Sequence, residues 1–125
     1  MKVLDTSVAV DHLRGFPPAV ECLRRVVDSG EELVASELVR FELVAGVREE
    51  AREDLEEFFS IPTWLSVDAE VARRAGELAR RYRRSHSGIG TTDYLVAATV
   101  EILDGELLTT NVRHFPMLRG LRPPY

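Results

Sequence analysis

Short apolar runs alternate along the chain with longer segments in which apolar residues recur at helical spacing. The short runs have the length of buried strands, and the longer segments repeat their apolar positions every three or four residues. The pattern predicts strands at residues 3–4, 33–35, 61–67 and 107–109. Strands that alternate with helices are typical of an α/β sandwich around a mainly parallel central sheet flanked by helices.

Capping and breaking residues set the expected ends of the helices. Thr6 and Ser7 offer an N-cap to the first helix, and Gly15 with Pro17 separates it from the second. The expected helices cover residues 8–13, 20–29, 37–46, 48–59, 69–84 and 91–103, with one helical turn at 112–115. In the second helix the apolar face is formed by Val20, Leu23, Val26 and Val27.

The composition is that of a globular chain of moderate size. With 125 residues, 45% hydrophobic and 30% charged, the sequence predicts a single domain, residues 1–125, that can bury a core. No apolar run approaches the ~20 residues that span a bilayer, and we expect no cleavable leader before the first strand. A single cysteine, Cys22, excludes an internal disulfide and fits a reducing compartment. We therefore expect a cytoplasmic protein without membrane contact.

The charge of the chain is acidic overall but locally basic. The formal net charge of −5 argues against binding of nucleic acid by bulk electrostatic attraction. One basic stretch, opposed within its span only by Glu77, consists of Arg73, Arg74, Arg80, Arg81, Arg83 and Arg84. This stretch is either a solvated helix face or a phosphate-binding stripe, and its last four arginines are the candidates for contact with a nucleic-acid backbone.

Four polar residues stand in otherwise apolar stretches: Asp5, Glu42, Asp93 and Asn111. A carboxylate placed against a core is unfavourable unless another group neutralises its charge. A hard divalent cation with oxygen ligands would do so. The pattern therefore indicates a small metal-dependent enzyme in which the three carboxylates hold the metal.

Fold geometry predicts that these four side chains meet at one edge of the sheet. Ligands of open parallel sheets bind at the carboxyl ends of the strands, and Asp5 and Asn111 lie at or just beyond two such ends. Asp93 is in the first turn of its helix, where the helix dipole favours a negative charge. Glu42 should share the face of its neighbours three and four residues away; these are Leu38, Val39, Ala45 and Gly46.

Each of the four residues also has a purely structural interpretation. Asp5 and Asp93 could cap helices. Asn111 could be a turn residue, and Glu42 could be a solvated charge. Together they favour a site, in which Asn111 would supply a neutral oxygen. The hydroxyl groups expected to hydrogen-bond the carboxylates in that site are those of Thr6, Ser7 and Thr110.

The histidines and the cysteine carry weaker signals. His12, His86 and His114 lack metal-ligand spacing, and we interpret them as surface or loop residues. His86 and His114 could still reach a substrate. Cys22 falls on the apolar side of its helix and is expected to be an inert core residue.

The polar positions belong to segments that, taken in order, resemble a known family. The segments are residues 3–7 (VLDTS), Glu42 with Gly46, residues 93–99 (DYLVAAT), residues 108–115 (LTTNVRHF) and residues 118–121 (LRGL). Each segment is weak by itself. The ordered set resembles the PIN domains, specifically the VapC-type toxin ribonucleases of toxin–antitoxin systems, over essentially the whole chain.

The resemblance implies a PIN-like three-layer sandwich and a Mg²⁺- or Mn²⁺-dependent endoribonuclease. Such proteins are usually dimeric and are neutralised by an antitoxin. Asp5, Glu42 and Asp93 match the family's acidic residues. Asn111 stands at a fourth position where some members carry Asp, which leaves open whether one or two ions bind.

Other classes that gather carboxylates at strand ends fit less well. A receiver domain would need a lysine late in the chain, and the only lysine is Lys2. A haloacid-dehalogenase-like phosphatase would need an Asp where Ser7 stands. The remaining alternative is a catalytically inactive PIN-like module that binds RNA or protein, which the presence of all three acids disfavours.

Overall fold

A single four-stranded sheet forms the centre of the protein in a computed structural model that describes residues 1–125. Its strands are β1 (Lys2–Leu4), β2 (Leu33–Ser36), β3 (Thr63–Leu65) and β4 (Glu106–Leu108). The strand order is β3-β2-β1-β4, and every neighbouring pair is parallel. The expectation of a mainly parallel sheet is therefore confirmed.

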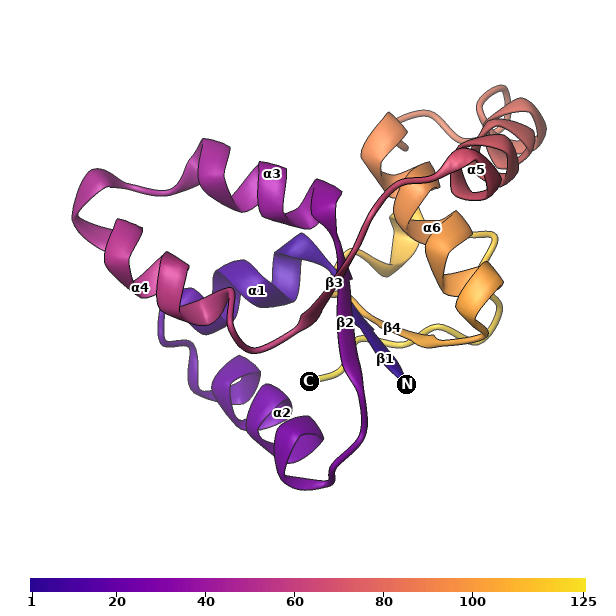
Figure 1. The fold of residues 1–125 in the computed structure, drawn as a ribbon. Helices are drawn as coiled ribbons and strands as arrows, with labels where there is room; N and C mark the ends of the chain where they lie inside the picture. Colours follow the sequence, from indigo (N-terminus) through magenta and orange to yellow (C-terminus); the bar gives the residue numbers. More distant parts are fainter.

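Helices cover both faces of this sheet, which makes a three-layer sandwich. They are α1 (Thr6–Leu13), α2 (Pro17–Asp28), α3 (Glu37–Gly46), α4 (Arg52–Phe58), α5 (Ala69–Tyr82) and α6 (Thr91–Leu103), with 3-10 turns η1 (Glu49–Ala51) and η2 (Val112–His114). Figure 1 shows the sheet nearly edge-on, with α1 to α4 on one side and α5 and α6 on the other. None of the helices combines the length and the apolar character that crossing a membrane requires.

The helix boundaries differ from the sequence prediction in three places. Asp5, not Thr6 or Ser7, is the N-cap residue of α1, and Pro17 begins α2 because its fixed φ suits the first helical position. Residues 48–59 divide into η1 and α4. On the apolar face of α2, Leu23 and Val26 are buried, whereas Val20 and Val27 are 37% and 53% exposed and lie outside the core.

The connection from α6 into β4 depends on a small residue. Asp104 ends α6 in the left-handed conformation, with φ of 52°, and Gly105 follows it. A Cβ at Gly105 would lie 2.9 Å from Cγ2 of the buried Val3. Glycine is therefore required for β4 to approach β1 this closely.

The strand order creates a natural binding crevice beside β1. The chain proceeds from β1 to β2 and β3 on one side, and then returns to place β4 on the other side of β1. The backbone N–H of Asp5 donates to the carbonyl of Leu108 across these two strands at 3.0 Å. Ligands of open α/β sheets bind at such a reversal, outside the carboxyl ends of the strands.

Candidate active site

A cavity of about 430 Å³ opens at the carboxyl ends of β1 and β4. The four residues that the sequence singled out all line it, and they come from four separate parts of the chain: Asp5, Glu42, Asp93 and Asn111. The remaining lining residues are Thr6, Ser7, Val10, Asp11, Thr110 and His114. The structure thus brings the predicted residues together, while their chemical roles remain predictions.

Asp5 is the most buried carboxylate of the cavity, with 5% of the residue exposed. Thr109 Oγ1 donates to Asp5 Oδ2 at 2.6 Å, and Ser7 Oγ donates to the same oxygen at 3.1 Å. The register of β1 on β4 pairs Leu4 with Leu108, which brings the next residues, Asp5 and Thr109, side by side. Asp5 Oδ1 accepts no hydrogen bond from the protein, so it is available to a ligand.

Glu42 reaches the cavity from α3. Thr6 Oγ1 donates to Glu42 Oε1 at 2.7 Å, which ties α1 to α3, and Oε2 has no partner within the protein. Of the neighbours with which Glu42 was expected to share a face, Ala45 and Gly46 are exposed. Val39 is fully buried on the inner side of α3, so Glu42 stands at the border between core and cavity.

Asp93 has both of the roles that the sequence left open, a helix cap and a cavity carboxylate. The backbone N–H of Gly90 donates to Asp93 Oδ2 at 3.1 Å, and His114 Nδ1 lies 3.3 Å from the same oxygen. Burial raises the pKa of Asp93, and the charge of Asp5 adds to this increase. The Gly90 N–H and His114 oppose the increase without cancelling it.

The carboxylates of Asp5, Glu42 and Asp93 share an arrangement that suits the binding of a divalent ion. In each one, a protein donor holds one oxygen and the other oxygen accepts nothing from the protein. Donors of this kind fix the orientation of metal ligands, and carboxylate and amide oxygens suit a hard cation. No three His, Cys, Asp or Glu side chains lie close enough to share one ion as they stand. Binding would therefore require the free oxygens to rotate toward one another.

The hydroxyl that best supports Asp5 belongs to Thr109, which the sequence analysis did not select. Thr109 is fully buried, and its Oγ1 also accepts the backbone N–H of Asn111 at 3.0 Å. Thr110, to which we assigned a contact with a carboxylate, donates its backbone N–H to Ser7 Oγ at 3.1 Å. The expected hydroxyl contacts of Thr6 and Ser7 are present.

Two further residues of the cavity were not selected as site residues, although His114 was noted as able to reach a substrate. Asp11 lies four residues after Ser7, on the same side of α1, and the hydroxyl of Tyr125 donates to its Oδ2 at 2.7 Å. The helical spacing from Ser7 was the available signal. His114, interpreted as a surface or loop residue, lies in the cavity beside Asp93.

The other two histidines, His86 and His12, differ in how well they match the expected surface or loop positions. His86 is exposed in the loop after α5, as expected. His12 is only partly exposed, because its ring packs against Phe58 with centroids 5.3 Å apart and its buried Nδ1 has no partner. Burial lowers the pKa of His12 accordingly.

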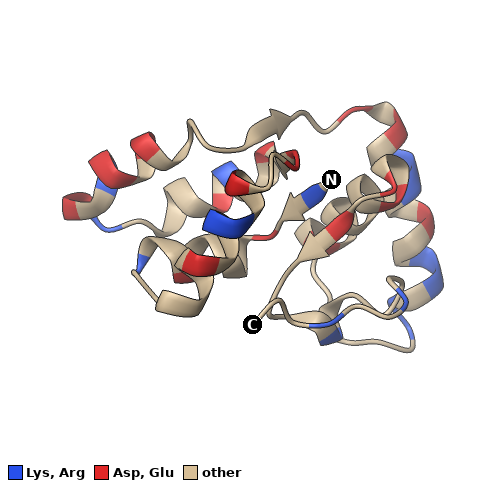
Figure 2. Cartoon of the chain, turned by 90° about the horizontal axis from the view of Figure 1, so that it is seen from below, with Lys and Arg blue, Asp and Glu red and all other residues tan.

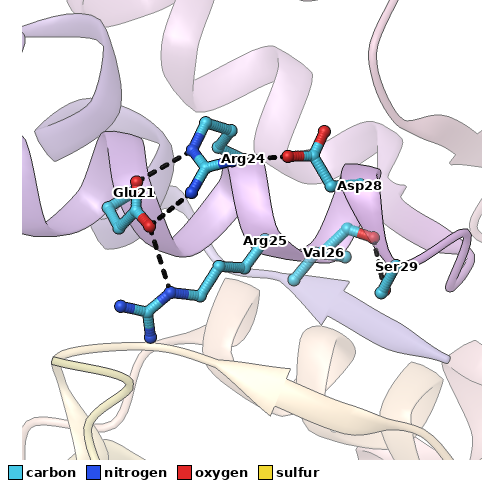
Figure 3. A network of polar contacts seen from close by, with 6 residues as sticks. All are labelled: Glu21, Arg24, Arg25, Val26, Asp28 and Ser29. Carbon is cyan, nitrogen blue, oxygen red and sulfur yellow. Dashed lines mark hydrogen bonds and ion pairs between the residues drawn. The ribbon is translucent and has the colours of Figure 1, made fainter.

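The basic stretch lies outside the cavity, at the end of α5 that leads to α6. Its last four arginines are exposed, and none has a carboxylate within ion-pair distance. Figure 2 shows this basic part of α5 at the opposite end of the molecule from the acidic α4. By contrast, Glu21 and Asp28 neutralise Arg24 on α2 (Figure 3).

A parallel α/β sandwich with an acidic cavity beside its first strand is a PIN-like arrangement, and comparison with known proteins agrees. The PIN-domain profile matches residues 2–119. Ribonuclease VapC19 of Mycobacterium tuberculosis is 58% identical over 125 residues, which is all of both chains. The chain therefore belongs to the PIN-domain family, among its VapC-type members.

Solved structures share the same fold. A toxin–antitoxin complex from Klebsiella pneumoniae aligns with a TM-score of 0.81 at 19% identity, over 100% of this chain and 98% of that one. VapBC2 from Rickettsia felis, bound to a DNA fragment from its promoter, also aligns with a TM-score of 0.81, at 21% identity, over 96% and 94% of the two chains. At these identities the likeness establishes the fold.

Proposed function

We propose that this protein is a metal-dependent endoribonuclease and the toxin of a toxin–antitoxin pair. The observation that carries the proposal is the single cavity lined by Asp5, Glu42 and Asp93, each with one oxygen free. The full-length identity of 58% to a ribonuclease supports RNA as the substrate. An inactive binding module would have no need for three carboxylates held in this way.

The residues of the cavity would have different roles in phosphodiester hydrolysis. Asp5 would hold Mg²⁺ or Mn²⁺ through its free Oδ1, and Asp93 would hold the ion through its carboxylate. When bound, the ion would neutralise charge on the phosphate and lower the pKa of a water molecule. Glu42 Oε2 would bind the same ion or accept a hydrogen bond from the attacking water. Asn111 would offer its amide oxygen as a neutral ligand or hold a water bound to the ion.

Metal-dependent cleavage of a mixed RNA pool tests the function. We expect the purified protein to cleave RNA at internal phosphodiester bonds in Mg²⁺ or Mn²⁺. Cleavage should stop when EDTA removes the ion. Addition of excess Mg²⁺ after EDTA treatment should restore cleavage. Recovery would exclude irreversible unfolding as the cause of the lost activity. Binding of RNA without any metal-dependent cleavage would favour the inactive module instead.

Asn111→Asp is expected to retain RNA cleavage and to tighten metal binding about tenfold. The change adds a carboxylate to the cavity, and an added opposite charge strengthens the attraction to a cation. Calorimetric titration with Mn²⁺ measures the affinity, and the cleavage assay measures activity. Weaker Mn²⁺ binding in a folded variant would show that Asn111 has a different role.

Changing Arg80, Arg81, Arg83 and Arg84 together to serine should weaken RNA binding and flatten its salt dependence. Each lost phosphate contact removes about 0.7 from the slope of log affinity against log salt for a single strand, so the slope should fall by roughly 3. Binding is measured by fluorescence anisotropy at several salt concentrations with the Asp5→Asn variant as background, so that RNA is not cleaved.

Arginines that are already neutralised provide the control for this experiment. Serine at Arg24 and Arg25, which pair with Glu21 on α2, removes positive charge where a carboxylate has cancelled it (Figure 3). The salt slope of the control should match that of the starting protein. An unchanged slope in the fourfold variant would make the basic stretch a solvated helix face.

A groove next to the cavity supports an antitoxin as the protein partner. The groove, of about 590 Å³, lies between α1, α3 and η1, and Val10 and Glu42 line both it and the acidic cavity. Apolar lining residues in the groove include Leu13, Leu43 and Val47. An apolar peptide segment carrying a basic side chain would fill the groove and reach Glu42, which would block access to the cavity.

Three further properties complete the proposal. Residues 1–125 would act as one nuclease domain, and the protein would form a homodimer, as the family resemblance implies. Location of the protein in the cytoplasm would give it access to cellular RNA. Sedimentation equilibrium of the purified chain, with and without the antitoxin, measures the oligomeric state.

A further inference from the structure

One pair of side chains in the cavity joins a carboxylate to an imidazole. Asp93 reaches it from the first turn of α6 and His114 from η2, and their side chains are 23% and 36% exposed. Oδ2 of Asp93 and Nδ1 of His114 are 3.3 Å apart. No lysine or arginine lines the cavity, so His114 contributes its only ionisable nitrogen.

The separation of the two atoms suits two ligands of one ion. A hydrogen bond from imidazolium to carboxylate has a typical length of about 2.7–2.9 Å, shorter than the distance found here. A small divalent ion holds oxygen and nitrogen ligands at about 2.0–2.2 Å, so two ligands at a right angle to each other lie about 3 Å apart. The Asp93 and His114 atoms are close to this spacing without an ion.

Both partners are held by the surrounding backbone. The N–H of Gly90 fixes Asp93 Oδ2 at 3.1 Å, and an oxygen with two lone pairs can accept this bond and still bind an ion. The N–H of His114 donates to the carbonyl of Asn111 at 2.9 Å. The next residue, Phe115, is 1% exposed and anchors η2 in the core. The imidazole therefore has a fixed base from which to bind a ligand.

We propose that His114 is a metal ligand of this site, beside Asp93, and that it makes the site select Mn²⁺ over Mg²⁺. The inference rests on the metal-dependent function proposed above. Mg²⁺ prefers oxygen ligands and retains its water, whereas transition-metal ions accept imidazole nitrogen. A mixed carboxylate–imidazole site is therefore expected to favour the transition-metal ion.

Pulsed electron paramagnetic resonance of the Mn²⁺-loaded protein tests this ligand directly. We expect ¹⁴N modulation from a bound imidazole in the wild type and its loss in His114→Ala. His86→Ala is the matched control, because His86 is exposed, lies outside the cavity and hydrogen-bonds Ser85. The control should keep the modulation. Absence of ¹⁴N modulation in the Mn²⁺-loaded wild type, or its persistence in His114→Ala, would overturn the proposal.

Calorimetric titrations with Mn²⁺ and with Mg²⁺ test the selectivity. His114→Ala should lose at least about tenfold in the ratio of Mn²⁺ to Mg²⁺ affinity. His114→Asp should bind Mg²⁺ more tightly than His114→Ala does, because it returns an oxygen ligand to the position. An unchanged ratio in His114→Ala would contradict the selectivity.

The two proposals fail in different ways. A wild type that cleaves RNA with Mn²⁺ but shows no nitrogen coupling overturns the role of His114 alone. A wild type that neither binds Mn²⁺ nor cleaves RNA overturns the proposed function, and the role of His114 with it.

Discussion

Asp5→Asn is expected to reduce RNA cleavage by at least about a hundredfold, a typical cost of removing one charged or donor group from a catalytic centre. The amide has the shape of the carboxylate, and its oxygen can accept the same hydrogen bonds from Thr109 and Ser7. The substitution therefore retains the local structure and removes the charge that would hold a hard cation. Cleavage of a fluorescent RNA in Mg²⁺ measures the loss, and relief of growth arrest on expression should accompany it.

The matched control for this loss is Asp104→Asn. Asp104 is exposed at the end of α6, makes no side-chain hydrogen bond and adopts a left-handed backbone conformation that asparagine also tolerates. This variant should cleave RNA like the wild type. Cleavage by Asp5→Asn at a near wild-type rate would show that Asp5 only caps α1 and that the site has been assigned wrongly.

Asp93→Asn should melt at a higher temperature than the wild type when EDTA keeps the protein free of metal at pH 7. Burial raises the folded-state pKa of Asp93, so the folded protein binds the proton more tightly than the unfolded chain. The resulting penalty is absent below the unfolded pKa, grows as pH rises through that value, and is complete above the folded pKa. At pH 7 its removal should stabilise the variant by on the order of 1 kcal/mol, or about 4 °C.

Two comparisons isolate this effect in thermal melts. The difference between variant and wild type should shrink as pH falls to the unfolded-state pKa and below it, where the carboxyl is protonated in both states. It should also shrink in Mg²⁺, which binds the folded wild type. Asp68→Asn is the control, because Asp68 also accepts a helix N–H, from Val71 at 2.9 Å, but lies outside the cavity. The control should show no gain in stability. If Asp93→Asn melts lower than wild type in EDTA, its capping contact with Gly90 outweighs the charge.

Much of the fold could be predicted because its signals are local. The spacing of apolar residues acts within one or two helical turns, so the predicted ranges 37–46 and 69–84 lie close to α3 and α5, which Ser36 and Asp68 cap. The predictions that were wrong concern which side of an element is covered. Val27 of α2 has the right spacing for a core residue and is nevertheless 53% exposed.

The sequence by itself determined the parallel α/β architecture and the four residues of the acidic cavity. A carboxylate that interrupts an apolar run is visible in one dimension, since burial of its charge requires compensation. Only the tertiary structure decided which groups provide that compensation. Thr109 reaches Asp5 through the register of β4 on β1, and His114 reaches Asp93 through the packing of η2 beside α6. These contacts join residues distant in the chain, and local periodicity carries no information about such pairings.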